Sequence, residues 1–179
     1  MKKRIVLFLF ALLIATTVWY TFPKTLVKQL DGVYYQLGKD EIIRNIAVQI
    51  DGTLQKSLLG KRTFKGEIKI EGEDFVVPAN QRQLELTFSK ADNRGFLNYG
   101  YVDDEANPKV YSYGVIYMNP DFTEFTIAKY EKDHEEDFGG SWSGADGFMI
   151  TAPADDRASA ITISNRLMKN FLLEGDLLR

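Results

Sequence analysis

Hydrophobic and polar residues alternate along the chain from Ile42 onward. In the stretches "RNIAVQIDGTLQKS" and "RTFKGEIKIEG", apolar residues recur at even spacings, at Ile46, Val48, Ile50 and Leu54 and then at Phe64, Ile68 and Ile70. A period of two is typical of strands that have one buried face and one face in water. The intervening "SLLGKR" predicts a turn that joins the two strands as an antiparallel pair.

Five further short segments continue this β pattern. They are "QLELTF", "FLNYGYV", "KVYSYGVIYM", "EFTIAKY" and "GFMIT", and "NPD" at 119–121 marks a turn. Because "KVYSYGVIYM" is apolar on both faces, we expect it to be a central strand. Counted together, these segments predict seven or eight antiparallel strands. The pattern leaves open whether the sheet closes into a barrel.

The first 22 residues have a different pattern. "MKKR" carries three cations, and the next 18 residues, Ile5 to Phe22, have no charge. As a helix they would be about 27 Å long, close to the thickness of a hydrocarbon core. Trp19 and Tyr20 stand where an interfacial aromatic belt would lie. A retained membrane anchor is therefore predicted, with the N-terminus cytoplasmic and the remainder exported.

A cleaved signal peptide is the alternative for this segment. Ala15-Thr16-Thr17 is a poor cleavage site, and the apolar run continues past it. In residues 24–38, Leu26, Leu30, Val33 and Leu37 recur at helical spacing and predict a short juxtamembrane helix or stalk, weakened by Gly32. A first strand over "VYYQL" is the alternative there.

The C-terminal segment returns to a helical period. Pro153 and Asp155 mark its start and Gly175 its end. One stripe at spacings of three and four contains Ala160, Ile161, Ser164, Leu167, Met168, Phe171 and Leu172. The sequence thus predicts a mainly β (α+β) fold with a C-terminal amphipathic helix packed on the sheet. Its segments are an anchor (1–23), a stalk (24–41) and one extracytoplasmic domain (42–179).

Composition narrows the possible chemistry. The chain has no cysteine and one histidine, His134, which excludes thiolate nucleophiles and zinc sites of several histidines. Three of the 22 cations precede the apolar run, so 19 cations face 25 acids in the remainder, a formal net charge of −6. This charge argues against a nucleic-acid partner and disfavours direct docking on anionic lipid.

The stretch "FGGSWSGADGFMITAPADD" (138–156) is the most site-like in the chain. A serine-hydrolase elbow needs Gly-x-Ser-x-Gly, and Gly139 to Ser143 do not match at the last position. We therefore expect a tight connection into a strand and then a helix, with no catalytic residue. Trp142 would either cover an open end of the core or stand out as a binding aromatic.

Two acidic clusters, Asp103 to Glu105 and Glu131 to Asp137, lack the alternating ligand pattern of a calcium loop. Solvated loop charge is their expected role, and no metal and no cofactor are predicted. "DGTLQKSLLGKRTFKGEIKI", with the late "MITAPA" and the final helix, resembles a group of N-terminally anchored proteins of Gram-positive bacteria that has no assigned activity. The resemblance implies placement in the cell envelope and one β-rich domain, and it implies no functional residues.

Three functions remain compatible with the sequence. The first is a membrane-tethered, non-enzymatic domain that binds an envelope protein, a wall polymer or a small apolar ligand. Its expected binding surface contains the aromatic residues Trp142, Tyr99, Tyr101, Tyr111 and Tyr113. The second is an envelope hydrolase that uses a pair of carboxylates. The third is a structural subunit whose helix or stalk packs on a membrane partner.

Overall fold

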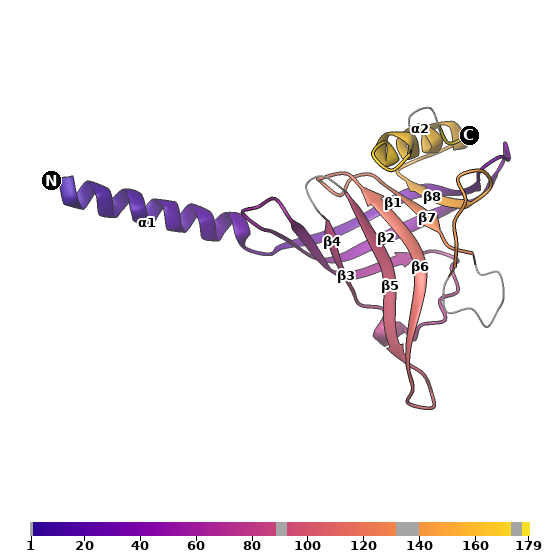
Figure 1. Cartoon of the computed structure of the whole chain (residues 1–179), viewed down its shortest axis with the longest axis horizontal. Helices are drawn as coiled ribbons and strands as arrows, with labels where there is room; N and C mark the ends of the chain where they lie inside the picture. Colours follow the sequence, from indigo (N-terminus) through magenta and orange to yellow (C-terminus); the bar gives the residue numbers. More distant parts are fainter. Residues whose placement is uncertain (1, 89–92, 132–139, 173–176) are drawn as a thin grey trace.

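The computed structural model of the chain describes residues 2–88, 93–131, 140–172 and 177–179. Within these ranges the chain forms eight strands, two α-helices and one short 3-10 helix (Figure 1). In chain order they are α1 (Lys2–Thr21), β1 (Lys24–Gln36), β2 (Ile42–Lys56), β3 (Arg62–Ile70), η1 (Ala79–Gln81), β4 (Leu84–Phe88), β5 (Arg94–Val102), β6 (Pro108–Met118), β7 (Phe125–Lys129), β8 (Phe148–Ala152) and α2 (Arg157–Met168).

All eight strands belong to one antiparallel sheet. Its order is β4-β3-β2-β1-β8-β7-β6-β5, so each half is a simple meander and β8 returns to pair with β1. The two edge strands, β4 and β5, lie against each other, which makes the sheet a nearly closed barrel. The predicted β-domain with a terminal helix is confirmed.

Side chains close the seam between β4 and β5. The Gln81 side-chain amide donates to the Val102 carbonyl at 3.1 Å and accepts from the Val102 N–H at 2.7 Å. It thus makes the pair of hydrogen bonds that a neighbouring strand would make with Val102. Near the other end of the seam, the buried Arg62 donates to the Asn93 amide oxygen. The edge backbone is thereby partly protected from pairing with other chains.

The strands separate two hydrophobic clusters. The barrel interior is filled by Ile46, Val48, Ile50, Phe64, Ile68, Ile70, Val77, Leu84, Leu86, Phe88, Leu97, Tyr99, Tyr113, Ile116, Met118, Phe122, Phe125, Ile127, Ile150 and Ala152. The outer cluster lies under α2 and contains Val33, Tyr35, Leu37, Val115, Tyr117, Ala128, Met149, Ala154, Ala160, Met168 and Leu178. Strand β6 contributes to both clusters, as expected of a strand that is apolar on both faces.

The helix expected over 24–38 is wrong, because residues 24–36 form strand β1. Leu26 and Leu30 face the barrel interior, whereas Val33 and Tyr35 face the outer cluster. Apolar residues four positions apart lie on one side of a helix and also on one face of a strand, so their spacing does not distinguish the two here. The alternative, a first strand over "VYYQL", is confirmed, and β1 pairs with both β2 and β8.

Helix α2 is held on the sheet by a cluster of hydroxyls. Ser164 Oγ lies 2.8 Å from Tyr35 Oη and 2.9 Å from each of Thr126 Oγ1 and Thr151 Oγ1, and all four residues are buried. The helix begins at an N-cap, Asp156, whose side chain accepts from Ser159 N. Three strands are thereby joined to one position of the helix.

Helix α1 is long and apolar enough to cross a membrane, with a mean hydropathy of 1.8 and no residue buried against the rest of the chain. Only Phe22 and Pro23 separate it from β1. We call the barrel end beside α1 the proximal end; it carries the β2–β3 turn (57–61) and the β6–β7 turn (119–124) (Figure 1). The opposite, distal end carries the connections 37–41, 71–83 and 103–107.

Candidate functional site

The four predicted tyrosines lie together inside the distal half of the barrel, and Trp142 lies elsewhere. Tyr99 and Tyr113 are 1% and 2% exposed, whereas Tyr101 and Tyr111 are half-buried. Phe75, from the β3–β4 connection, inserts among them: its ring stacks on Tyr113 at 5.0 Å and meets Tyr99 edge-on at 5.5 Å. Two of these four tyrosines are therefore interior residues with almost no accessible surface.

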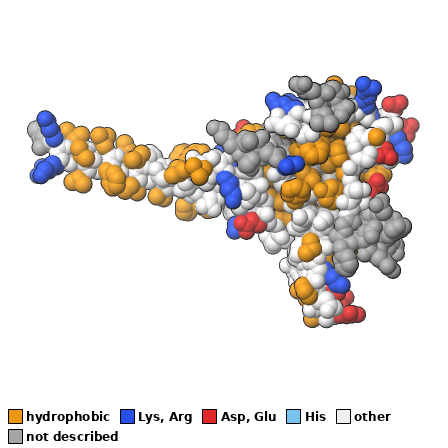
Figure 2. All heavy atoms as spheres, in the orientation of Figure 1, with side chains coloured by type: hydrophobic (Ala, Val, Ile, Leu, Met, Phe, Trp, Pro, Cys, Tyr) orange, Lys and Arg blue, Asp and Glu red, His pale blue; other side chains and the backbone are white. Residues whose placement is uncertain are grey.

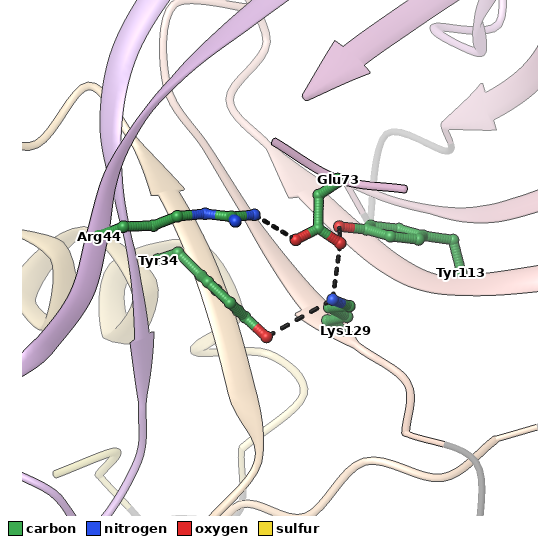
Figure 3. Close-up of polar contacts among 5 residues, drawn as sticks. All are labelled: Tyr34, Arg44, Glu73, Tyr113 and Lys129. Carbon is green, nitrogen blue, oxygen red and sulfur yellow. Dashed lines mark hydrogen bonds and ion pairs between the residues drawn. The ribbon is translucent and has the colours of Figure 1, made fainter. Parts of the chain in front are cut away.

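Next to these rings, a charged cluster closes the distal end (Figure 3). The Glu73 carboxylate accepts from Arg44 at 2.5 Å, from Lys129 Nζ at 2.6 Å and from Tyr113 Oη at 3.0 Å. Lys129 also lies 3.5 Å from Tyr34 Oη. The Glu73 side chain is 9% exposed, so its charge depends on these partners instead of water.

The surroundings of the cluster raise the pKa of two of its members, Tyr113 and Lys129. Burial raises the pKa of Tyr113 well above its ordinary value, and the adjacent Glu73 carboxylate raises it further. Burial alone lowers the pKa of the Lys129 ammonium, but the hydrogen bond to Glu73 and the neighbouring Tyr34 and Glu73 charges raise it overall. Lys129 is therefore held in its charged form and Tyr113 in its neutral form.

This arrangement does not suit hydrolysis by paired carboxylates. Such a mechanism needs two carboxyl groups on either side of the bond that is cleaved, one of them kept protonated by an apolar environment. In the described part of the chain, the partners that Glu73 contacts are two cations and a tyrosine hydroxyl. With Phe75, Glu73 instead fixes the β3–β4 connection across the barrel end.

A second candidate site lies outside the barrel, in a groove between α2 and strands β5 to β7. It consists of two adjoining pockets of about 340 and 240 Å³, which share Arg94, Tyr117 and Phe171. The floor of the smaller pocket is apolar and aromatic, formed by Phe96, Val115, Tyr117, Ala128, Tyr130, Trp142 and Phe171. We call both pockets together the α2 groove; hydrophobic side chains gather in this part of the surface, beneath α2 (Figure 2).

Two large apolar side chains in the α2 groove face solvent. Phe96 is 52% exposed and Phe171 is 46% exposed. Phe171 was expected on the buried stripe of the terminal helix, and this expectation is wrong because α2 ends at Met168, one turn earlier. The N–H of Phe171 still bonds to the Met168 carbonyl, and its ring packs 6.4 Å from that of Trp142.

Cations mark the larger pocket of the groove. Arg94, Arg166 and Lys169 line it together with one acid, Glu124, which pairs with Arg166 at 2.6 Å. The Arg94 guanidinium lies 5.8 Å from the ring centres of both Phe96 and Phe171. The groove thus offers an apolar floor beside a positively charged pocket, which suits an apolar group next to a negative charge.

The loop 140–147 places Trp142 at the groove. Ser141 forms a two-way backbone bridge with Glu131, and the Gly147 carbonyl accepts from Leu37 N at 3.0 Å. Trp142 is half-buried against the outer cluster, and its Nε1 is enclosed without a hydrogen-bond partner among the described residues. The predicted tight connection into β8 and then α2 is confirmed for residues 140–156, while 138, 139 and His134 lie outside the described residues.

The described residues contain no group of three or more His, Asp or Glu side chains that could hold a metal ion. Asp103 instead accepts from the N–H groups of Glu105 and Asn107 within its own turn, and the bond from Asn107 is the main cause of its lowered pKa. Most of the second acidic run, residues 132–137, lies outside the described residues.

Comparison with protein-family models, curated proteins and solved structures finds no match for this chain. The assignment of a site therefore depends on the geometry of its own residues. The sequence identified Trp142 but not Phe96 and Arg94, which line the same pocket, or Arg166, which lines the adjoining one. An apolar residue at an outward position of β5 was the available signal, since Phe96 alternates with the inward Leu97.

Proposed function

We propose that this chain is a membrane-tethered, non-enzymatic binding domain of a bacterial cell envelope. In this proposal α1 anchors the chain in the cytoplasmic membrane with Lys2, Lys3 and Arg4 inside, and the barrel faces outward. The length and composition of α1 support the anchor. The envelope placement follows from this orientation and from the resemblance to anchored Gram-positive proteins.

The observation that carries the proposal is the α2 groove. Exposed phenylalanines that are adjacent to a half-buried tryptophan are unusual on a surface that only contacts water. The floor supplies contact area without hydrogen-bonding groups at Phe96 and Phe171, so the ligand part that lies there is apolar. The cations of the larger pocket favour a ligand that carries a negative charge next to this apolar part.

We propose that the occupant is a segment of a partner protein that presents an aromatic or aliphatic side chain beside carboxylates. A wall polymer of phosphates would satisfy the cations but would leave the apolar floor without a complement. A purely structural subunit would need no open groove of this kind. The distal cluster of Glu73 is assigned to stability because its polar groups already bind one another.

Fluorescence polarisation on the full-length chain in nanodiscs tests this function. The probes are labelled nonapeptides with one phenylalanine between aspartates, and counterparts in which lysines replace the aspartates. We expect saturable binding of the acidic peptides alone, and at least tenfold weaker binding by F96A and F171A. Val110→Ala, at an exposed position on the distal part of β6, is the matched control and should bind as the unchanged chain does.

Two results would contradict the proposal. Binding of both peptide sets with equal affinity would remove the role of the cations, and binding that survives F96A and F171A would place the site elsewhere. Binding of a polyphosphate that does not depend on Phe96 would instead identify an anionic polymer as the ligand.

A further inference from the structure

The tip of the β2–β3 turn projects two leucines beside the end of α1. Leu59 is 92% exposed and Leu58 is 67% exposed. Tyr20 of α1 lines the same surface pocket as both leucines, which places the tip next to the C-terminal end of that helix. The apolar tip therefore lies where a bilayer crossed by α1 would have its interface.

Hydrogen bonds hold this tip in a fixed shape. Ser57 N donates to the Lys61 carbonyl at 2.8 Å, and Lys61 N donates back to Ser57 Oγ at 3.1 Å. Gly60 supplies the positive φ of +79° that the turn needs. Because the backbone is fixed in this way, the exposure of the two leucines is a property of the folded turn.

The charges of the barrel are distributed unevenly between its ends. The proximal turns 57–61 and 119–124 carry one base, Lys61, and two acids, Asp121 and Glu124. Three further cations, Lys24, Lys56 and Arg62, line the two pockets beside α1. The distal connections 37–41, 71–83 and 103–107 carry eight acids and two bases. The net negative charge of the domain, which disfavours docking on anionic lipid, therefore belongs largely to the end that faces away from α1.

We propose that the β2–β3 tip is a second membrane contact. Leu58 and Leu59 enter the interfacial region of the bilayer that α1 crosses, and Lys56 and Lys61 pair with anionic headgroups there. The inference rests on the proposed function only in that α1 spans the bilayer. With two contact points the barrel has one orientation on the membrane surface, which presents the α2 groove at a constant angle.

The cysteine-free chain allows a site-specific test in nanodiscs of the full-length protein. A fluorophore is attached at Gln55→Cys, near the tip, or at Gln83→Cys, at the distal end; both glutamines are exposed. Headgroup spin-labelled lipid then measures proximity to the bilayer by quenching. We expect at least threefold more quenching at position 55 than at 83 in nanodiscs that contain anionic lipid.

The decisive comparison is the double substitution L58S/L59S in the Gln55→Cys background. Loss of at least half of the quenching, with Val76→Ser at the distal end as a neutral control, supports the contact. Unchanged quenching would overturn it, because proximity would then come from α1 alone. Likewise, K61Q should reduce quenching in anionic nanodiscs. If neither K61Q nor the removal of anionic lipid changes the quenching, the headgroup pairing is overturned.

Failure of this contact and failure of the proposed function give different results. A chain that does not enter nanodiscs contradicts the anchor itself. A chain that enters nanodiscs and binds the acidic peptides, but keeps its quenching in L58S/L59S, contradicts the second contact alone.

Discussion

Lys129 on β7 and Glu73 in the β3–β4 connection form an ion pair of 2.6 Å across the distal end of the barrel. Their side chains are 21% and 9% exposed, and Arg44 shares the carboxylate. Removing one member of a buried pair leaves the other charge without compensation. The pair thus ties a long connection to the end of a strand 56 residues away in the sequence.

Substitution of Lys129 by methionine should destabilise the domain. With Arg44 still present, we expect a loss of about 2 kcal/mol in the free energy of unfolding. Urea titration of the full-length chain in detergent micelles, followed by circular dichroism, measures this loss. The double variant E73Q/K129M should lose less than the sum of the two single variants, and simple additivity would show that the pair is not coupled.

Ser164 is expected to stabilise the docking of α2 on the sheet. S164A removes the group that joins Tyr35, Thr126 and Thr151 to the helix, and we expect a loss of about 1–2 kcal/mol in the same assay because the remaining hydroxyls still bind one another. Thr162→Ala, on the exposed face of α2, is the matched control. Equal effects of the two substitutions would mean that the hydroxyl cluster adds nothing to stability.

Stability should fall at alkaline pH. Burial raises the pKa of Tyr99 and Tyr113 in the folded state, so above about pH 10 the unfolded chain loses its phenolic protons first. The raised pKa of Lys129 acts in the same direction, because its stabilising charge is lost as the pH rises through that value. Chemical denaturation at pH 8 to 11 should show a shallower decline for Y99F and Y113F, and an unchanged slope would contradict the burial of these phenols.

A cross-strand pair of glycines sets the distance between β2 and β3. Gly52 lies opposite Gly66, and a Cβ on Gly66 would overlap the Asp51 carbonyl oxygen and Gly52 Cα. Gly66→Ala should therefore cost about 1–3 kcal/mol, as overpacking does. Gly100→Ala is the control, since a Cβ there meets nothing within 4 Å. If the two substitutions lower the melting temperature by similar amounts, the loss of stability comes from the unfolded chain and not from the contact between Gly52 and Gly66.

The strands from Ile42 onward were predictable because their alternation reports one wet and one dry face. Strand β1 was assigned to a helix because its leucines are four residues apart, and because its distal half is covered on both faces. Such a strand loses the alternation that identifies it. Barrel closure could not be predicted, since it needs both the pairing of β1 with β8 across more than a hundred residues and the contact between the edge strands β4 and β5.

The candidate site was predicted in part. Trp142 was expected either to cover an open end of the core or to stand out as a binding aromatic; its side chain is half-buried against the outer cluster, and whether it binds a partner stays a prediction. The tyrosines were grouped as aromatic residues in excess of what the core needs, and the sequence alone does not show which of them fill the interior of a barrel. The sequence did not identify Glu73, because this residue lies in an irregular connection and its three partners come from three other strands, β2, β6 and β7.

The connection between α1 and the barrel has only two residues, Phe22 and Pro23, and so reaches at most about 7 Å. Strand β1, with 13 residues, is about 43 Å long. With α1 in a bilayer, every surface of the domain stays within a layer a few nanometres deep at the membrane surface. A partner in the same membrane then meets it by lateral diffusion at a high local concentration, so an affinity too weak to hold the two proteins together in solution would suffice.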